Sequence, residues 1–244
     1  MINETYRQML KGKSVIRELS EYAAARGREI GYGNVFDYSL GNPSVPCPRE
    51  YTDALIKMLK EEDPMAIHGY SPSLGIESVR KAVADSLNRR FHMDYEAGHI
   101  FMACGAAGAL AHAFRCVTKP GDEILVFAPY FPEYGPYINQ TGAVLKAVPA
   151  DTENFQINFH ALEEVMNEKV AAVLINTPNN PSGAVYSTRT IQKLADFLRA
   201  KQNEYGHDIF LISDEPYREI VFQGADSPYV SKFYDNSVSC YSFS

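Results

Sequence analysis

The chain has 244 residues, of which 45% are hydrophobic and 22% are charged, with a formal net charge of −7. This composition is typical of a globular protein with a sizeable core, and the scattered lysines and arginines lack the clustered basic face that binds nucleic acid. No apolar run approaches the roughly 20 residues needed to span a bilayer, and the first residues do not form a signal peptide. We therefore expect a cytoplasmic protein that binds small polar metabolites, and neither nucleic acid nor a membrane.

The four cysteines are far apart in the sequence: Cys47, Cys104, Cys116 and Cys240. They lack the paired Cys-x-x-Cys spacing of zinc and redox sites. We expect reduced thiols and no metal site.

The predicted elements begin with a helical stretch from Ser14 to Arg26. A glycine-rich segment then leads to a loop in which Pro43, Pro46 and Pro48 exclude regular structure. We expect residues 1–46 to form an N-terminal arm and a segment of a small domain. Residues 47–244 are then one large domain, since no linker separates two independent folds.

From about residue 100 onward, short β-rich runs alternate with helical patterns, which is typical of a mainly parallel sheet covered by helices on both faces. The predicted strands are Ile100–Cys104, Glu123–Ala128, Ala143–Val148, Val170–Asn176, Ile209–Ser213 and Val238–Phe243. Several are apolar without alternation, as strands buried on both faces should be. The predicted fold class is α/β, with a three-layer αβα arrangement.

The helices of this domain follow from the spacing of apolar residues and from capping residues. One helix follows Gly75 and has on one face Ile76, Val79, Val83, Leu87 and Phe91. Another spans Ala109–Val117. A third follows the cap Asn158 and turns inward Leu162, Val165 and Met166. A fourth follows Ser187 and Thr188 and has on one face Ile191, Leu194, Ala195 and Leu198.

A group of small residues, Gly105-Ala106-Ala107, follows a predicted strand and opens an apolar helix. A helix N-terminus presents unpaired N–H groups and a partial positive charge, which suits a phosphate, and small residues let a phosphate approach the backbone closely. The alternative is a turn at which helix and sheet pack tightly. A Gly-x-Gly-x-x-Gly pattern is absent, which argues against a dinucleotide.

Three further loops follow apolar strands, at the edge where open α/β sheets bind their ligands. The first is Asn179-Asn180-Pro181-Ser182-Gly183, which is also consistent with a plain Pro/Gly turn. The second runs from Asp214 to Tyr217, where Asp214 is alternatively a helix cap with Pro216 in the first turn. The third, residues 129–134, is aromatic and is equally consistent with core packing.

These loops, the closing Ser242-Phe243-Ser244 and the segment Tyr70–Gly75 with Arg80 resemble, in order and spacing, the aspartate-aminotransferase-like class I/II family of pyridoxal-phosphate enzymes. The resemblance covers about Gly41 to Ser244. It implies the large cofactor-binding domain of fold type I, a homodimer, pyridoxal 5'-phosphate as cofactor, and amino acid and 2-oxo acid substrates.

The resemblance also implies what should follow Ser244. The next residue would be the lysine that forms a Schiff base with the cofactor, and the C-terminal small domain would come after it. We expect a chain that continues beyond a cofactor-modified lysine rather than a truncated fragment.

Several residues receive catalytic and ring-binding roles through the resemblance. Asp214 would hold the pyridine nitrogen protonated, which makes the ring a better electron sink. Tyr217 and Asn180 would donate to the phenolate oxygen of the ring, and Phe131 would stack on the ring face.

Other residues receive phosphate and substrate roles in the same way. The phosphate would contact Ser242 and the helix start at Gly105, Ala106 and Ala107, and Tyr70 would reach the phosphate site of the partner subunit. The substrate carboxylate would meet Gly41 and Asn180. Taken alone, Tyr70 is only a surface tyrosine and Gly41 only a loop glycine.

The implied function is an aminotransferase that moves an amino group from an amino acid to a 2-oxo acid by a ping-pong mechanism. One alternative is β-elimination, as in carbon–sulfur lyases, because the same electron sink serves both reactions. Another is a non-catalytic fragment of a cofactor-binding transcription regulator, although the arm before Gly41 leaves no room for a helix-turn-helix. These residues do not identify the amino acid or the 2-oxo acid.

Overall fold

A computed structural model describes Glu4, Arg7 and residues 14–41, 45–150, 153–222 and 224–243. The chain forms two compact units, Met1–Tyr70 and Ser71–Ser244. Pro43 of the proline-rich loop and Ser244 of the closing motif lie outside the described residues. Within the described ranges, every helix is too short or too polar to cross a membrane. The domain division expected after residue 46 stays a prediction.

The described part of the first unit contains α2 (Val15–Ile30), the 3-10 turn η1 (Tyr32–Asn34), α3 (Arg49–Glu61) and α4 (Pro64–His68). The helix predicted from Ser14 is confirmed as α2, which continues to Ile30. α3 and α4 were not predicted from the sequence. The sequence does contain a signal for α4, because Asp63 directly before Pro64 is typical of a helix start. In the structure, the Asp63 side chain caps α4 by accepting a hydrogen bond from the Met65 amide at 3.1 Å.

The second unit is built on a five-stranded parallel sheet in the order β2-β1-β3-β4-β5. Its strands are β1 (Glu123–Phe127), β2 (Val144–Val148), β3 (Val170–Asn176), β4 (Phe210–Glu215) and β5 (Ser237–Tyr241). They confirm the predicted strands after residue 104, with β3 at its predicted bounds. β4 runs further than predicted, so Asp214 lies within the strand and not after it.

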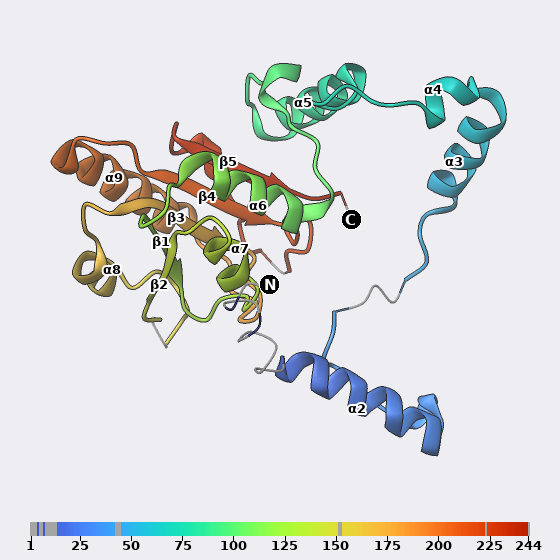
Figure 1. The fold of residues 1–244 in the computed structure, drawn as a ribbon, viewed down its shortest axis with the longest axis horizontal. Helices are drawn as coiled ribbons and strands as arrows, with labels where there is room; N and C mark the ends of the chain where they lie inside the picture. Colours follow the sequence, from blue (N-terminus) through green and yellow to red (C-terminus); the bar gives the residue numbers. More distant parts are fainter. Residues whose placement is uncertain are drawn as a thin grey trace. The chain divides into compact units, whose positions relative to one another are not determined.

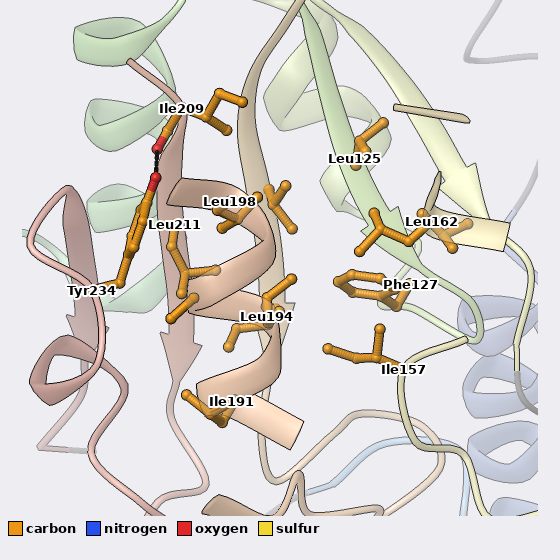
Figure 2. Close-up of a cluster of buried hydrophobic side chains, with 14 of the residues drawn as sticks. Leu125, Phe127, Ile157, Leu162, Ile191, Leu194, Leu198, Ile209, Leu211 and Tyr234 are labelled. Carbon is orange, nitrogen blue, oxygen red and sulfur yellow. Dashed lines mark hydrogen bonds between the residues drawn. The ribbon is translucent and has the colours of Figure 1, made fainter. Parts of the chain in front are cut away.

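Helices cover both faces of the sheet, which confirms the three-layer αβα arrangement (Figure 1). The helices of this unit are α5 (Glu77–Phe91), α6 (Gly105–Val117), α7 (Tyr134–Asn139), α8 (Phe159–Val165) and α9 (Thr188–Tyr205), with 3-10 turns η2 (Ala97–His99) and η3 (Val230–Lys232). α6 and α7 bury Leu110, Phe114 and Ile138 against one face. On the opposite face, α8 and α9 bury a larger cluster that includes Leu162 and Leu194 (Figure 2).

Asn158 is confirmed as the cap of α8 and Ser187 as the cap of α9, whereas Thr188, the other candidate, is the first residue of the helix. The Asn158 side chain accepts from the Ala161 amide at 3.1 Å, and Ser187 Oγ accepts from the Thr190 amide at 3.1 Å. Each bond satisfies a backbone donor that the first turn of a helix leaves open.

The strand predicted from Ile100 to Cys104 is wrong. This segment pairs with no strand of the described residues and leads irregularly from η2 into α6. Phe101 is 54% exposed and Met102 is 38% exposed, so the segment is not buried on both faces. Its apolar character suggested a strand, but a strand also needs a neighbour that satisfies its backbone groups, which local composition does not reveal.

Candidate active site

A cavity of about 190 Å³ lies where β3 and β4 reach their carboxyl ends. It is lined by Ala106, Ala107, Leu110, Phe131, Tyr137, Asn176, Asn180, Asp214, Pro216 and Tyr217. Parallel strands end at the same edge of a sheet, so loops that are distant in sequence meet there. The cavity thus brings together most of the residues singled out from the sequence: Ala106, Ala107, Phe131, Asn180, Asp214 and Tyr217.

Asp214 is a buried carboxylate in this lining, with 5% of its surface exposed. Its Oδ2 accepts a hydrogen bond from the Tyr134 hydroxyl at 2.5 Å, whereas its Oδ1 has no hydrogen-bond partner among the described residues. Burial raises the pKa of the Asp214 carboxyl to about 6, the Tyr134 hydrogen bond opposes that rise, and the nearby Glu215 adds to it. A buried oxygen without a partner is costly unless a ligand donates to it.

Asn180 and Tyr217 lie together at the cavity, because Asn180 Nδ2 donates to the Tyr217 hydroxyl at 3.2 Å. The loop that carries Asn180 is anchored to the sheet. The backbone amide of Asn180 donates to Asn176 Oδ1 at 2.6 Å, and Asn176 Nδ2 donates to the backbone carbonyl of Asp214 at 2.9 Å. This chain of hydrogen bonds fixes the Asn180 loop relative to the end of β4.

The start of α6 forms another wall of the cavity. Gly105 has a φ of 71°, where a side chain is disfavoured, although a Cβ there would meet no atom within 4 Å. Glycine is therefore favoured here by the backbone conformation and not by a lack of room for a side chain. Ala106 and Ala107 follow in the first turn and line the cavity, where backbone N–H groups lack intrahelical partners and suit an anion.

Four predicted site residues are not part of this lining. Gly105 and Ser242 belong to the second unit but do not line the cavity, and Ser242 is half-buried just after β5. Gly41 and the fully exposed Tyr70 belong to the first unit. The roles given to these four residues stay predictions.

Sequence reasoning missed two residues that hold the site together. Asn176 is a buried polar residue at the last position of an apolar strand, which was a usable signal. Tyr134 belonged to the aromatic loop in which only Phe131 received a role, and no local pattern shows that its hydroxyl reaches β4. The alternative interpretation of Asp214 as a helix cap is wrong, because residues 216–219 form a turn.

Comparison with known proteins gives the same family along most of the chain. Residues 34–244 match the family model of aminotransferase class I and II. The chain is 33% identical over 199 residues to a probable aspartate/prephenate aminotransferase of Aquifex aeolicus, covering 81% of this chain and 48% of that protein. It is 30% identical over 185 residues to a methionine aminotransferase of Escherichia coli, covering 75% of this chain and 45% of that protein.

A solved structure supports the same relationship. The crystal structure of an amino transferase from Eubacterium rectale matches with a TM-score of 0.95 and 46% identity, over 100% of this chain and 61% of that chain. This chain spans about half the length of the curated relatives it matches. The family match, the parallel sheet and the loops at its carboxyl edge agree, and the chain belongs to the class I and II aminotransferase family.

Proposed function

We propose that the complete protein containing these residues is a pyridoxal 5'-phosphate-dependent aminotransferase. It moves an amino group between an amino acid and a 2-oxo acid, both small polar metabolites of the cytoplasm, by a ping-pong mechanism. One observation carries the proposal. The buried Asp214 carboxylate lines a cavity beside a helix start, and its Oδ1 accepts from no donor of the described residues. Family membership supports the same activity.

The residues of the cavity fit this cofactor. An anionic phosphate suits the first turn of α6 at Ala106 and Ala107. A protonated ring nitrogen would supply the donor that Asp214 Oδ1 does not find in the described part of the chain. Phe131 offers an aromatic face, as stacking on a ring requires. When bound, the cofactor supplies an electron sink that makes the Cα proton of an amino acid acidic.

The side chains divide the remaining work by their donors and acceptors. Above its pKa of about 6, Asp214 is an anion, and an anion at Oδ1 favours the protonated form of a ring nitrogen. The Tyr217 hydroxyl accepts from Asn180, so its own proton is available to an acceptor in the cavity. The side-chain amide of Asn180 has two protons. It donates one to Tyr217, and the other can donate to a ligand.

Borohydride reduction of the complete protein with pyridoxal 5'-phosphate tests the cofactor. Reduction makes an imine bond between cofactor and lysine permanent, so peptide mapping should find the label on the peptide that follows Ser244. A label elsewhere, or no label, would contradict the proposal.

Amino-group transfer from amino acids to 2-oxo acids tests the activity. Asp214→Ala should lower the transfer rate by roughly a thousandfold, because it removes charge that stabilises the transition state. Asp85→Ala is the matched control, since Asp85 lies on an exposed face of α5 in a pair with Lys81. Equal rates in the two variants would overturn the role of Asp214. Pyruvate release without an acceptor would instead identify a β-lyase.

A further inference from the structure

Tyr134 and Asp214 form a hydrogen-bonded pair to which the proposed function assigns only one member. Tyr134 begins α7, is 2% exposed, and places its hydroxyl 2.5 Å from Asp214 Oδ2. Its ring packs edge-on against Phe131, with centroids 5.6 Å apart and an angle of 81° between the rings. Packing in the core between α7 and the sheet fixes the orientation of this hydroxyl.

Among the described residues, one donor reaches the Asp214 carboxylate, the Tyr134 hydroxyl. On β5, Cys240 is the register partner of Asp214, and burial raises the pKa of its thiol well above neutral pH. Burial and the Asp214 charge raise the pKa of Tyr134, and burial with the charges of Glu133 and Asp214 raises the pKa of Tyr137. Tyr217 also lines the cavity, and its hydroxyl accepts a hydrogen bond from Asn180 Nδ2.

The neighbouring Glu215 already has a cationic partner, because it forms an ion pair with Arg218. Asp214 itself makes no ion pair with any described residue. A cationic neighbour would cancel its charge and compete with a cationic ligand, whereas a phenol that keeps its proton does neither. Tyr134 therefore leaves the full negative charge of Asp214 for the occupant of the cavity.

We propose that Tyr134 is a positioning residue whose hydrogen bond to Oδ2 fixes the carboxylate, leaves Oδ1 as its open acceptor, and keeps a shared proton on the ring nitrogen of the cofactor. This inference rests on the proposed function. The two forms of the pair are Oδ1⁻ with N–H⁺, and Oδ1–H with N, so the same single proton lies on one atom or the other. Donation to Oδ2 stabilises the carboxylate and lowers the basicity of Oδ1, which favours the first form.

The test compares three versions of the complete protein, each bound to pyridoxal 5'-phosphate that is isotope-labelled at the ring nitrogen for magnetic resonance. They are the parent, Tyr134→Phe and the control Tyr234→Phe. Tyr234 is also 2% exposed, and its hydroxyl donates at 2.7 Å to the Ile209 carbonyl in the core on the other face of the sheet (Figure 2). The control thus loses a buried tyrosine hydrogen bond that is unrelated to the cavity.

The ring nitrogen should give the resonance of a protonated pyridine in the parent and in Tyr234→Phe. In Tyr134→Phe it should move toward the resonance of a neutral pyridine. The preference for the cofactor over an analogue with carbon in place of the ring nitrogen should also fall about tenfold in Tyr134→Phe. An unchanged resonance, or equal weakening of both ligands, would overturn the inference and leave the proposed function standing. Failure of the parent to bind the cofactor would instead refute the proposed function.

A second measurement applies if Tyr134→Phe does not fold. A ring-fluorinated tyrosine incorporated at position 134 keeps the hydroxyl and adds little volume. Its fluorine resonance should shift when the cofactor binds and should shift less with the analogue that lacks the ring nitrogen. The same shift with both ligands would show that Tyr134 does not sense the shared proton.

Discussion

Asp214 lies in the protein interior, and its environment favours the protonated form. Its pKa in the folded chain is about 6, compared with an ordinary value of 3.8. Between these two values the folded state binds more protons at this site than the unfolded state does. The free energy of unfolding therefore decreases as pH rises from about 4 to about 6. The full loss is on the order of 3 kcal/mol, because one pH unit corresponds to about 1.4 kcal/mol.

We predict that Asp214→Asn stabilises the cofactor-free protein at neutral pH. An amide has no charge to bury and can still accept from Tyr134, so unfolding should require up to roughly 3 kcal/mol more than in the parent above pH 6. The difference should shrink toward zero near pH 4, where Asp214 is protonated. Urea unfolding across this pH range measures it. Asp85→Asn makes the same change in an exposed pair with Lys81 and serves as the control. A stability difference for Asp214→Asn that does not depend on pH would contradict the prediction.

The turn after β4 is an element held by a buried ion pair. Glu215 and Arg218 are 1% and 5% exposed and are bonded through the Arg218 Nε. Arg218 also donates to the carbonyls of Ser227 at 3.1 Å and Pro228 at 3.2 Å. Its guanidinium lies over the rings of Phe91 and Tyr229, 5.3 and 5.2 Å from their centroids. One side chain thus joins the turn that carries Tyr217, the segment before β5 and the end of α5.

Arg218→Met should destabilise the protein by about 3–5 kcal/mol, because it leaves the Glu215 charge buried and unpaired. Adding Glu215→Gln should recover part of that loss of stability, since it removes the unpaired buried charge. Lys81→Met breaks the exposed pair with Asp85 on α5 and should cost less than about 1 kcal/mol. Chemical unfolding of the parent, the two single variants and the double variant measures these differences. Similar losses of stability for Arg218→Met and Lys81→Met would refute the prediction.

Prediction of elements from the sequence succeeded where a local pattern has a single physical cause. β3 is apolar up to Asn176 and β4 is apolar in its first half, as expected for strands that helices cover on both faces of the sheet. The same criterion failed at Ile100–Cys104, where apolar residues do not reveal whether a strand has a neighbour. For the site, positions at or just after the carboxyl ends of strands predicted Asp214, Asn180 and Tyr217. Parallel strands end at the same edge of a sheet, so these three residues meet there. The Tyr134 contact joins positions 80 residues apart and depends on tertiary packing alone.

At the scale of the whole molecule, we propose that the complete protein is a homodimer with shared sites. Tyr70 supports this proposal, because its side chain is fully exposed within the described chain although it is large and aromatic. The motif position of Tyr70 predicts a contact with the phosphate site of a second copy. A two-fold symmetric assembly would then contain two such sites, each built from both subunits.

Mixing two inactive variants tests the shared site. If Tyr70 acts across the interface, subunits with Tyr70→Ala and subunits with Asp214→Ala should together form dimers in which one site has both native residues. Random mixing then restores about a quarter of the parent activity, because half of the dimers are mixed and each has one intact site of two. No recovery, although sedimentation shows mixed dimers, would place Tyr70 and Asp214 of one subunit in the same site.

The open acceptor at Asp214 Oδ1 also bears on how such a protein responds to laboratory evolution. A library screened for heat resistance without cofactor would enrich replacements of Asp214, because removal of the buried charge stabilises the empty protein. The same library screened with saturating cofactor would retain Asp214, because the ligand binds the folded state and adds its own free energy to stability. The choice of screening buffer would therefore decide whether stabilised variants keep the residue on which the proposed activity depends.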